Sequence, residues 1–186
     1  MRVLAISGSL RRDSHNSALL RAAASAAPPG VEFVVLHNLR NVPPYDQDRD
    51  VQPAPAAVQR LREAIASADA VLLSTPEYNS SLPGQLKNAL DWASRPFPAN
   101  VFRGKPVAVV GASQGIFGAA WAQAELRRVL GAIGARVIER DLSVATVHEA
   151  FGPGGQLLDP AHHDRLAEII RLLVEAAGGR STGRAA

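Results

Sequence analysis

The chain has 186 residues, of which 47% are hydrophobic and 20% are charged, and this balance predicts one compact soluble domain with a complete core. It contains no cysteine, which excludes disulfides, thiolate zinc sites, cysteine-bound iron–sulfur clusters and thiol nucleophiles, so redox chemistry would need a bound cofactor. The formal net charge is +3, and Arg180 and Arg184 supply two of these charges, so we do not expect a nucleic-acid partner.

Apolar runs alternate with amphipathic segments along the whole chain. The runs lack polar alternation, which is typical of strands covered on both faces, and the segments between them have the periodicity of helices. This order predicts an α/β fold with a doubly wound parallel sheet. The expected strands are residues 2–7, 31–37, 70–75, 106–111 and 136–142, and the expected helices are residues 16–27, 56–67, 84–94, 119–134 and 160–177.

Neither a membrane span nor an export signal is expected. No apolar run approaches the roughly 20 residues that cross a bilayer, and the chain passes from Met1 and Arg2 directly into a strand pattern. We therefore expect a cytoplasmic protein with no membrane partner. Residues 1–179 are expected to form a single domain, and residues 180–186 are expected to be a flexible tail.

The loop after the first strand, GSLRRDSHN, has the composition of an anion site. Ser9, Ser14 and Asn16 supply hydrogen-bond donors, Arg11 adds charge, and Asn16 is the expected N-cap of the next helix. The exposed N–H groups and the dipole of that helix favour a phosphate monoester. An ordinary capped helix with surface arginines is the alternative, and neither a Rossmann fingerprint nor a P-loop is present.

The loop after the third strand, PEYNSSLPG, is the second candidate. Pro76 and a second proline stiffen it, and Glu77, Tyr78 and Asn79 lie between them. Such a loop offers a flat heteroaromatic ring a rigid wall and backbone donors and acceptors. The alternative is that Tyr78 packs on a neighbour and Asn79 shapes a turn. Further on, Trp92 is expected in packing or in a subunit contact.

These loops resemble those of the NADPH-dependent FMN reductase family, which includes bacterial quinone, chromate and azo-dye reductases. The first carries G-S-L-R-x-x-S-x-N and the second P-E-Y-N-x-S-x-P-G-x-L-K-N-A-x-D-W. A weaker third match is Ser113-Gln114-Gly115 with Gly118. The chain departs from the family at Ala119 and Trp121, and the region after residue 142 matches poorly.

The resemblance implies a flavodoxin-like five-stranded parallel sheet of order 2-1-3-4-5 that binds FMN. It also implies a homodimer or homotetramer. By matching positions, the FMN phosphate would be held by Ser9, Arg11, Ser14 and Asn16. The ribityl chain and the ring would lie along Pro76, Glu77, Tyr78 and Asn79. Ser113 and Gly115 would close the other side of the phosphate or of the ring.

The expected reaction is hydride transfer from NADPH or NADH to flavin N5, and then to a small-molecule acceptor such as a quinone, an azo dye, a metal oxyanion or free flavin. No catalytic side chain and no metal site are expected, and His15 and the pair His162-His163 are expected at the surface. Tyr45 and Asp46 could border the open side of the ring. The alternatives are a flavodoxin-like electron carrier or redox-sensing module, and a flavin-free interaction domain.

Overall fold

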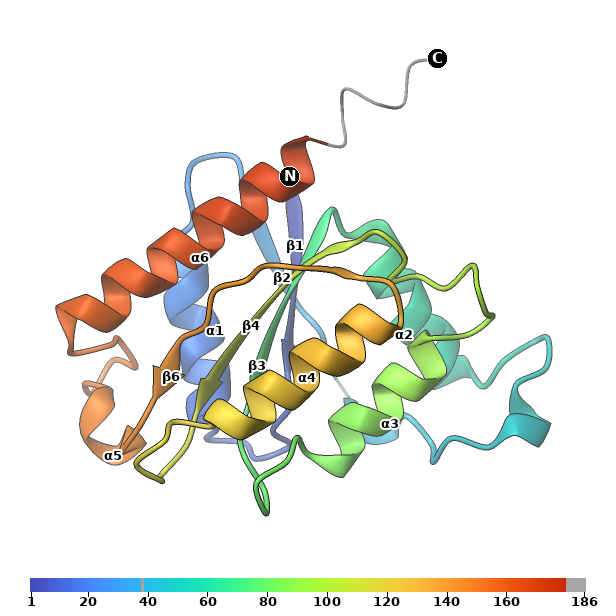
Figure 1. The fold of residues 1–186 in the computed structure, drawn as a ribbon, viewed down its shortest axis with the longest axis horizontal. Coiled ribbons are helices and arrows are strands. Elements are labelled where there is room, and N and C mark those ends of the chain that lie inside the picture. Colours follow the sequence, from blue (N-terminus) through green and yellow to red (C-terminus); the bar gives the residue numbers. More distant parts are fainter. Residues whose placement is uncertain (38, 180–186) are drawn as a thin grey trace.

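A computed structural model describes residues 1–37 and 39–179, so the predicted tail at 180–186 lies outside the described residues. The fold is the expected flavodoxin-like α/β sandwich, with one parallel sheet of order β2-β1-β3-β4-β5 (Figure 1). A short β6 pairs with β4 as well. The strands are β1 (Arg2–Ser7), β2 (Glu32–Val35), β3 (Ala70–Thr75), β4 (Pro106–Ala112), β5 (Arg136–Val137) and β6 (Ser143–Val144).

The three central strands form the rigid base of the site. Every residue of β3 and β4 is buried, as the unbroken apolar runs predicted for strands covered on both faces. The parallel register pairs Ser7 with Ser74 and Thr75 with Gly111. The carboxyl ends of β1, β3 and β4 therefore meet at one edge of the sheet, and the loops that follow them are neighbours.

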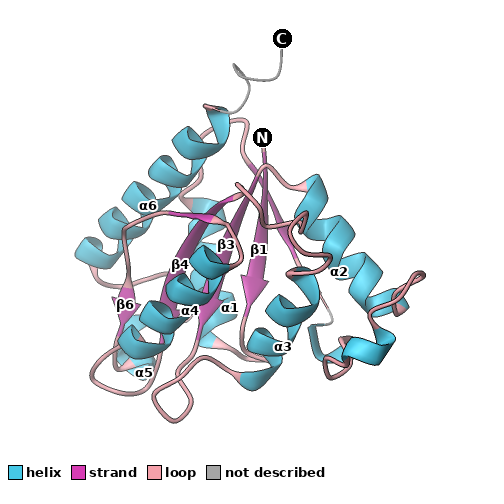
Figure 2. Cartoon of the chain, turned by 45° about the vertical axis from the view of Figure 1, so that its right-hand side comes forward, coloured by secondary structure: helices cyan, strands magenta, loops and turns pink. Residues whose placement is uncertain are grey.

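Helices cover both faces of the sheet (Figures 1 and 2). One apolar cluster joins the sheet to α2 (Ala56–Ser67), α3 (Gly84–Ala93) and α4 (Ala120–Ala132). A second cluster joins the other face to α1 (His15–Ser25) and α6 (Pro160–Gly178). Trp92 packs as expected, since it is fully buried and its indole N–H donates to the carbonyl oxygen of Pro43 at 2.9 Å.

The predicted fifth strand, residues 136–142, is interrupted. β5 pairs with the start of β4 and β6 with its end, and the ladder to β4 is broken between Ile138 and Leu142. The reason is the charge of three consecutive residues, Glu139, Arg140 and Asp141. In a strand covered on both faces these side chains would lose their contact with water, which is costly, whereas here they are exposed. Instead, Arg140 Nε lies 3.2 Å from a carboxylate oxygen of Glu168 on α6.

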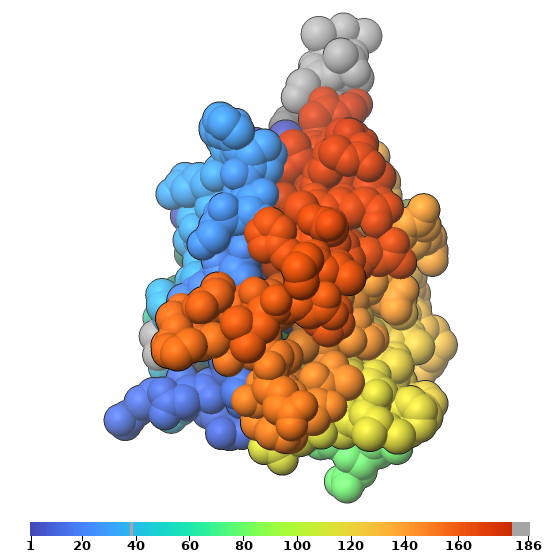
Figure 3. Space-filling model, turned by 90° about the vertical axis from the view of Figure 1, so that its left-hand side faces the viewer, coloured from blue at the N-terminus to red at the C-terminus, as the bar shows by residue number. Residues whose placement is uncertain are grey.

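Three short helices were not predicted: the 3₁₀ turns Leu39–Asn41 and Gln47–Arg49, and α5 (Val147–Ala150). Figure 3 shows the face on which the segment before α6 lies beside α1 and the chain after β4. There, the ring of Phe151 stacks on His15, with centroids 5.6 Å apart. Over the described part of the chain, no helix combines the length and apolar character needed to span a membrane.

Candidate functional site

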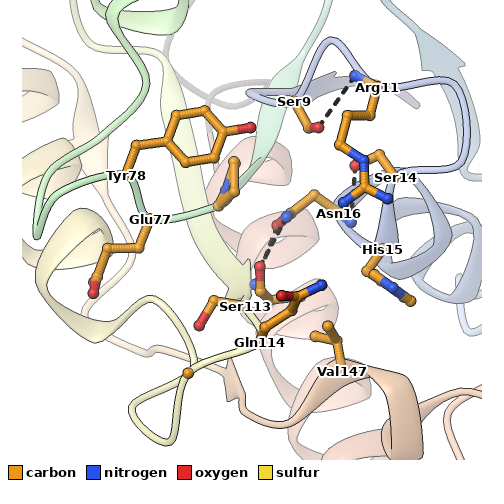
Figure 4. A pocket seen from close by; sticks show the side chains of 13 residues that line it. Ser9, Arg11, Ser14, His15, Asn16, Glu77, Tyr78, Ser113, Gln114 and Val147 are labelled. Carbon is orange, nitrogen blue, oxygen red and sulfur yellow. Dashed lines mark hydrogen bonds between the residues drawn. The ribbon is translucent and has the colours of Figure 1, made fainter.

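A pocket of about 390 Å³ opens at the carboxyl edge of the sheet, between the loops that follow β1, β3 and β4 (Figure 4). All but one of the predicted site residues line it, and the exception is Asn79. Sequence reasoning did not place four further lining residues in the site. The lining consists of Ser9, Arg11, Ser14, His15, Asn16, Pro76, Glu77, Tyr78, Ala112, Ser113, Gln114, Gly115 and Val147.

The β1–α1 loop begins with a close approach of backbone to helix. Gly8 donates its N–H to the carbonyl oxygen of Ser74 at 2.8 Å, and a Cβ atom at Gly8 would lie 2.9 Å from Leu86 of α3. The loop then turns, with the hydroxyl oxygen of Ser9 accepting from the N–H of Arg11 at 3.3 Å. This turn places Arg11 over the pocket in Figure 4.

The predicted N-cap Asn16 is wrong, because Ser14 caps α1. Ser14 has extended backbone, and its hydroxyl oxygen accepts from the N–H groups of Asn16 and Ser17 at 3.2 and 3.4 Å. The helix therefore begins at His15, inside the pocket lining, and its first N–H groups lie at this end of the pocket. Such a helix start favours a bound anion.

The Asn16 side chain is committed to the fold. Its amide nitrogen donates to the carbonyl oxygen of Ala112 at 2.9 Å, while its oxygen accepts from the Ala112 N–H at 3.1 Å and the Ser74 hydroxyl at 2.8 Å. The residue is 3% exposed. Asn16 thus joins the start of α1 to the ends of β3 and β4, and its side chain serves the fold.

Positive charge gathers at the α1 end of the pocket. Partial burial, and then the charges of Arg11 and His148, lower the pKa of the His15 imidazole below its usual 6.5. Burial is the largest of these causes, and the two neighbouring cations add to it, because a cation disfavours a second one nearby. An anion with several acceptor oxygens fits there, next to the serine hydroxyls and Arg11.

The β3–α3 loop forms the opposite wall. Pro76 is buried, while Tyr78 is 48% exposed at the rim. Tyr78 and Ser81 exchange backbone hydrogen bonds of 3.0 and 3.1 Å, and Asn79 lies at the tip of this turn with a φ of 52°. Asn79 therefore shapes the turn, as the alternative interpretation held, and is outside the pocket lining.

Glu77 holds the same loop against α4. A carboxylate oxygen of Glu77 accepts from the N–H of Ala122 at 3.1 Å, in the first turn of a helix that has no side-chain cap of its own. The hydroxyl of Ser81 donates to Glu125, also on α4, at 2.6 Å. Figure 4 shows the Glu77 carboxylate turned away from Arg11, so it does not compete for an anion.

The β4–α4 loop and α5 close the third side. The N–H groups of Val147 and Thr146 reach the carbonyl oxygens of Ser113 and Gly115 at 3.3 and 3.5 Å. Val147 enters the lining from a helix that has no clear signal in the sequence. His15 is another lining residue that was not predicted. Its position in the sequence, between the predicted ligands Ser14 and Asn16, could have indicated that it lies in the site.

Trp121 lies on helix α4, as expected, and is absent from the pocket lining. It is 49% exposed and meets Phe117 edge to face with centroids 4.5 Å apart. Tyr45 packs against Trp92 at 4.9 Å, and Asp46 caps a 3₁₀ turn by accepting from the N–H of Asp48. Neither Tyr45 nor Asp46 lines the pocket.

A parallel doubly wound sheet with a pocket at the carboxyl ends of β1, β3 and β4 defines a mononucleotide-binding protein of the flavodoxin type. The chain belongs to the NADPH-dependent FMN reductase family, whose model matches residues 1–149. It is an FMN-dependent oxidoreductase that uses NAD(P)H as the electron donor.

Known relatives match this chain over nearly its full length. An NAD(P)H-dependent FMN reductase of Pseudomonas aeruginosa is 44% identical over 177 residues, covering 95% of this chain and 92% of the relative. A quinone reductase of Escherichia coli is 40% identical and covers 89% of each chain. The solved structure of the flavoenzyme NAD(P)H:(acceptor) oxidoreductase FerB from Paracoccus denitrificans has a TM-score of 0.83 at 38% identity, covering 96% of this chain and 97% of that chain.

Proposed function

We propose that FMN binds in the 390 Å³ pocket, with its phosphate at the start of α1 and its ring along Pro76–Tyr78. The observation that carries this proposal is the convergence of Arg11, two serine hydroxyls and the N-terminus of α1 in one cavity. These are the donors a phosphate dianion needs, and Pro76 and Tyr78 supply a wall on the opposite side.

When bound, FMN supplies the hydride chemistry, by accepting at N5 and passing electrons to a second substrate. The protein's own contribution is binding and position. Glu77 and Ser81 fix the wall against α4, and Asn16 fixes the phosphate loop against β3 and β4. Held in this way, the pocket is pre-organised, which lowers the entropic cost of bringing the reactants together. No side chain is proposed as an acid or base.

A quinone is the favoured acceptor class, because the Escherichia coli relative is a quinone reductase. Azo dyes, metal oxyanions and free flavin are the other acceptors that the proposal allows. Donor and acceptor would react in turn at the same pocket, which is ping-pong kinetics. The cytoplasmic location expected from the sequence stays a prediction, to be tested by cell fractionation.

We also propose a homodimer or homotetramer. Ile116, Phe117 and Trp121 are 78%, 53% and 49% exposed, and they lie on the segment that runs from the pocket into α4. An exposed apolar group of this kind favours association, and a second copy placed there would border the pocket.

The decisive experiment is anaerobic reduction of the FMN-loaded protein by NADPH and NADH, followed by steady-state assays with each acceptor class. Bleaching of the flavin, with saturable turnover of a quinone, is the expected result. A flavin-containing protein that neither nicotinamide bleaches would support an electron carrier instead. A protein that fails to bind added FMN would support the flavin-free interaction domain.

A further inference from the structure

His15 lines the pocket assigned to FMN, and the proposed function gives its side chain no task. It is the first residue of α1 and directly follows Ser14, the cap of that helix. Figure 4 shows it between Arg11 and Val147, at the end of the pocket to which the phosphate of FMN is assigned. The His15 imidazole is therefore a neighbour of the group that binds there.

Packing holds the His15 ring in place. It stacks on the ring of Phe151, with centroids 5.6 Å apart and an angle of 29° between the two planes. Phe151 is itself fixed, because it pairs with Leu157, and because the next residue, Gly152, donates its N–H to the carbonyl oxygen of Gln156 at 2.9 Å. Within residues 1–37 and 39–179, no hydrogen bond or ion pair engages the His15 imidazole. Its ring nitrogens are therefore not committed to the fold.

The charges that act on His15 are positive. Partial burial, followed by Arg11 and His148, lowers the pKa of its imidazole below 6.5. Glu77, the acidic residue of the lining, accepts from the Ala122 N–H and is turned away (Figure 4). The other charged residues close to His15, on its own loop and on α5, are exposed to solvent: Arg12, Asp13 and Glu149. The imidazole of the free protein is thus neutral at neutral pH, in a place where a negatively charged ligand would favour its protonated form.

We propose that His15 determines the specificity of the flavin site, because its imidazole takes up a proton from solvent when a phosphate monoester binds beside it. The protonated imidazole and Arg11 would then share the dianion, and a flavin without phosphate would gain nothing from His15. The inference rests on the proposed function, which puts the phosphate at the start of α1. It goes beyond that proposal, because it predicts that FMN is preferred over riboflavin by a margin that depends on pH.

The direction of the pH dependence follows from the linkage between binding and protonation. An opposite charge within about 4–6 Å favours the charged form of a group by about tenfold or more. The bound phosphate would therefore raise the pKa of His15 above its value in the free protein, and between these two values binding takes up a proton. FMN affinity should fall as the pH rises through this interval. Below the interval, the imidazole is protonated in both states and its contribution to the affinity is complete.

The test is fluorescence titration of the apoprotein with FMN from about pH 8.5 to about pH 6, where a histidine titrates, for wild type and His15→Phe. Phenylalanine keeps an aromatic ring against Phe151 and removes the site of protonation. The second ionisation of the phosphate, at about pH 6, affects both titrations alike, so the dissociation constant of His15→Phe divided by that of wild type isolates His15. This ratio should rise at least about threefold toward acid pH. With riboflavin in place of FMN, the ratio should stay constant.

A ratio for FMN that stays constant with pH would overturn the inference and reduce His15 to a packing residue, and so would an equal rise with riboflavin. His163→Phe is the control, at a side chain of α6 that is 60% exposed and outside the lining, and it should match wild type at every pH. NMR titration of the wild type gives a second reading, because the His15 signal should titrate at higher pH with FMN bound than without it, and equal midpoints would overturn the inference. Failure of the wild type to bind FMN at any pH would instead refute the proposed function.

Discussion

Asn16 and Ala112 are 96 positions apart in the chain, yet they exchange two hydrogen bonds, of 2.9 and 3.1 Å. Through this contact, the side chain at the start of α1 holds the end of β4. The Ser74 hydroxyl, donating to the same Asn16 oxygen at 2.8 Å, adds β3 to the junction. A single buried amide thus sets the positions of the three loops that form the pocket.

Replacing Asn16 by alanine should lower the free energy of unfolding by about 3 kcal/mol, because the buried Ala112 N–H, Ala112 carbonyl and Ser74 hydroxyl would all lose their partner. Chemical denaturation would measure this. Ser17→Ala is the control, since it removes one hydroxyl contact of 3.2 Å with Ser7 and should cost below about 1 kcal/mol. Equal losses in the two variants would contradict the role assigned to Asn16.

Arg11→Ala should weaken FMN binding by about ten- to more than a hundredfold, because a charged hydrogen bond contributes roughly 1.5–3 kcal/mol. Fluorescence titration of apoprotein with FMN would measure the change. Arg12→Ala removes the same charge from the next position, which is exposed and outside the pocket lining, and should have a much smaller effect. An unchanged affinity in Arg11→Ala would take that residue out of the phosphate site.

Asp50 should make stability depend on pH in the acid range. Burial acts to raise the pKa of its carboxyl, but hydrogen bonds from Arg95 and Arg62, at 2.8 and 3.0 Å, outweigh burial and bring the pKa below its usual 3.8. Because the folded state favours the carboxylate, the stabilisation is present above that value and is lost as the pH falls through the folded pKa.

The measurement is denaturation of Asp50→Asn and wild type across acid pH. The difference in unfolding free energy should be largest near neutral pH and should shrink as the pH falls below the usual value of 3.8. Asp164→Asn, at a side chain that is 88% exposed, controls for the loss of one negative charge. A difference that stays constant down to the lowest pH would refute the assignment.

Gly118→Ala should destabilise the protein by more than about 2 kcal/mol. Gly118 has a φ of +56°, and a Cβ atom there would lie 2.6 Å from the carbonyl carbon of Ser143, so strain and a clash with backbone add together. Gly115→Ala is the matched substitution in the same loop, where the nearest heavy atom would be 3.7 Å away. Similar melting temperatures for the two variants would show that the loop can relax.

Trp121→Glu should dissociate the proposed oligomer, because it places a charge among Ile116, Phe117 and Trp121, which are exposed in the single chain. Light scattering coupled to gel filtration would report the mass of the particle. Ala161→Glu, at an exposed position at the start of α6, should leave the mass unchanged. A wild-type protein of one-chain mass, or a Trp121→Glu protein of unaltered mass, would contradict an interface at this position.

The features that could be predicted from the sequence are those that depend on residues close together in the chain. The apolar runs determined β1 and β3 with their observed bounds, and helical periodicity did the same for α2. The composition of the loops after β1, β3 and β4 indicated the pocket, because parallel strands bring their carboxyl ends to one edge. These features depend on neighbours in the chain, so the chain alone reveals them.

Only the tertiary structure decided the remaining features, because each depends on a partner far away in the chain. The Asn16 side chain hydrogen-bonds to β4 and does not cap α1, because Ala112 lies beside it. The N-cap of α1 is Ser14. Glu77 turned to α4, whose first turn lacked a side-chain acceptor. Val147 joined the pocket through backbone bonds to the loop after β4. Burial and hydrogen bonding at such meeting points follow from the packed fold, and no local pattern encodes them.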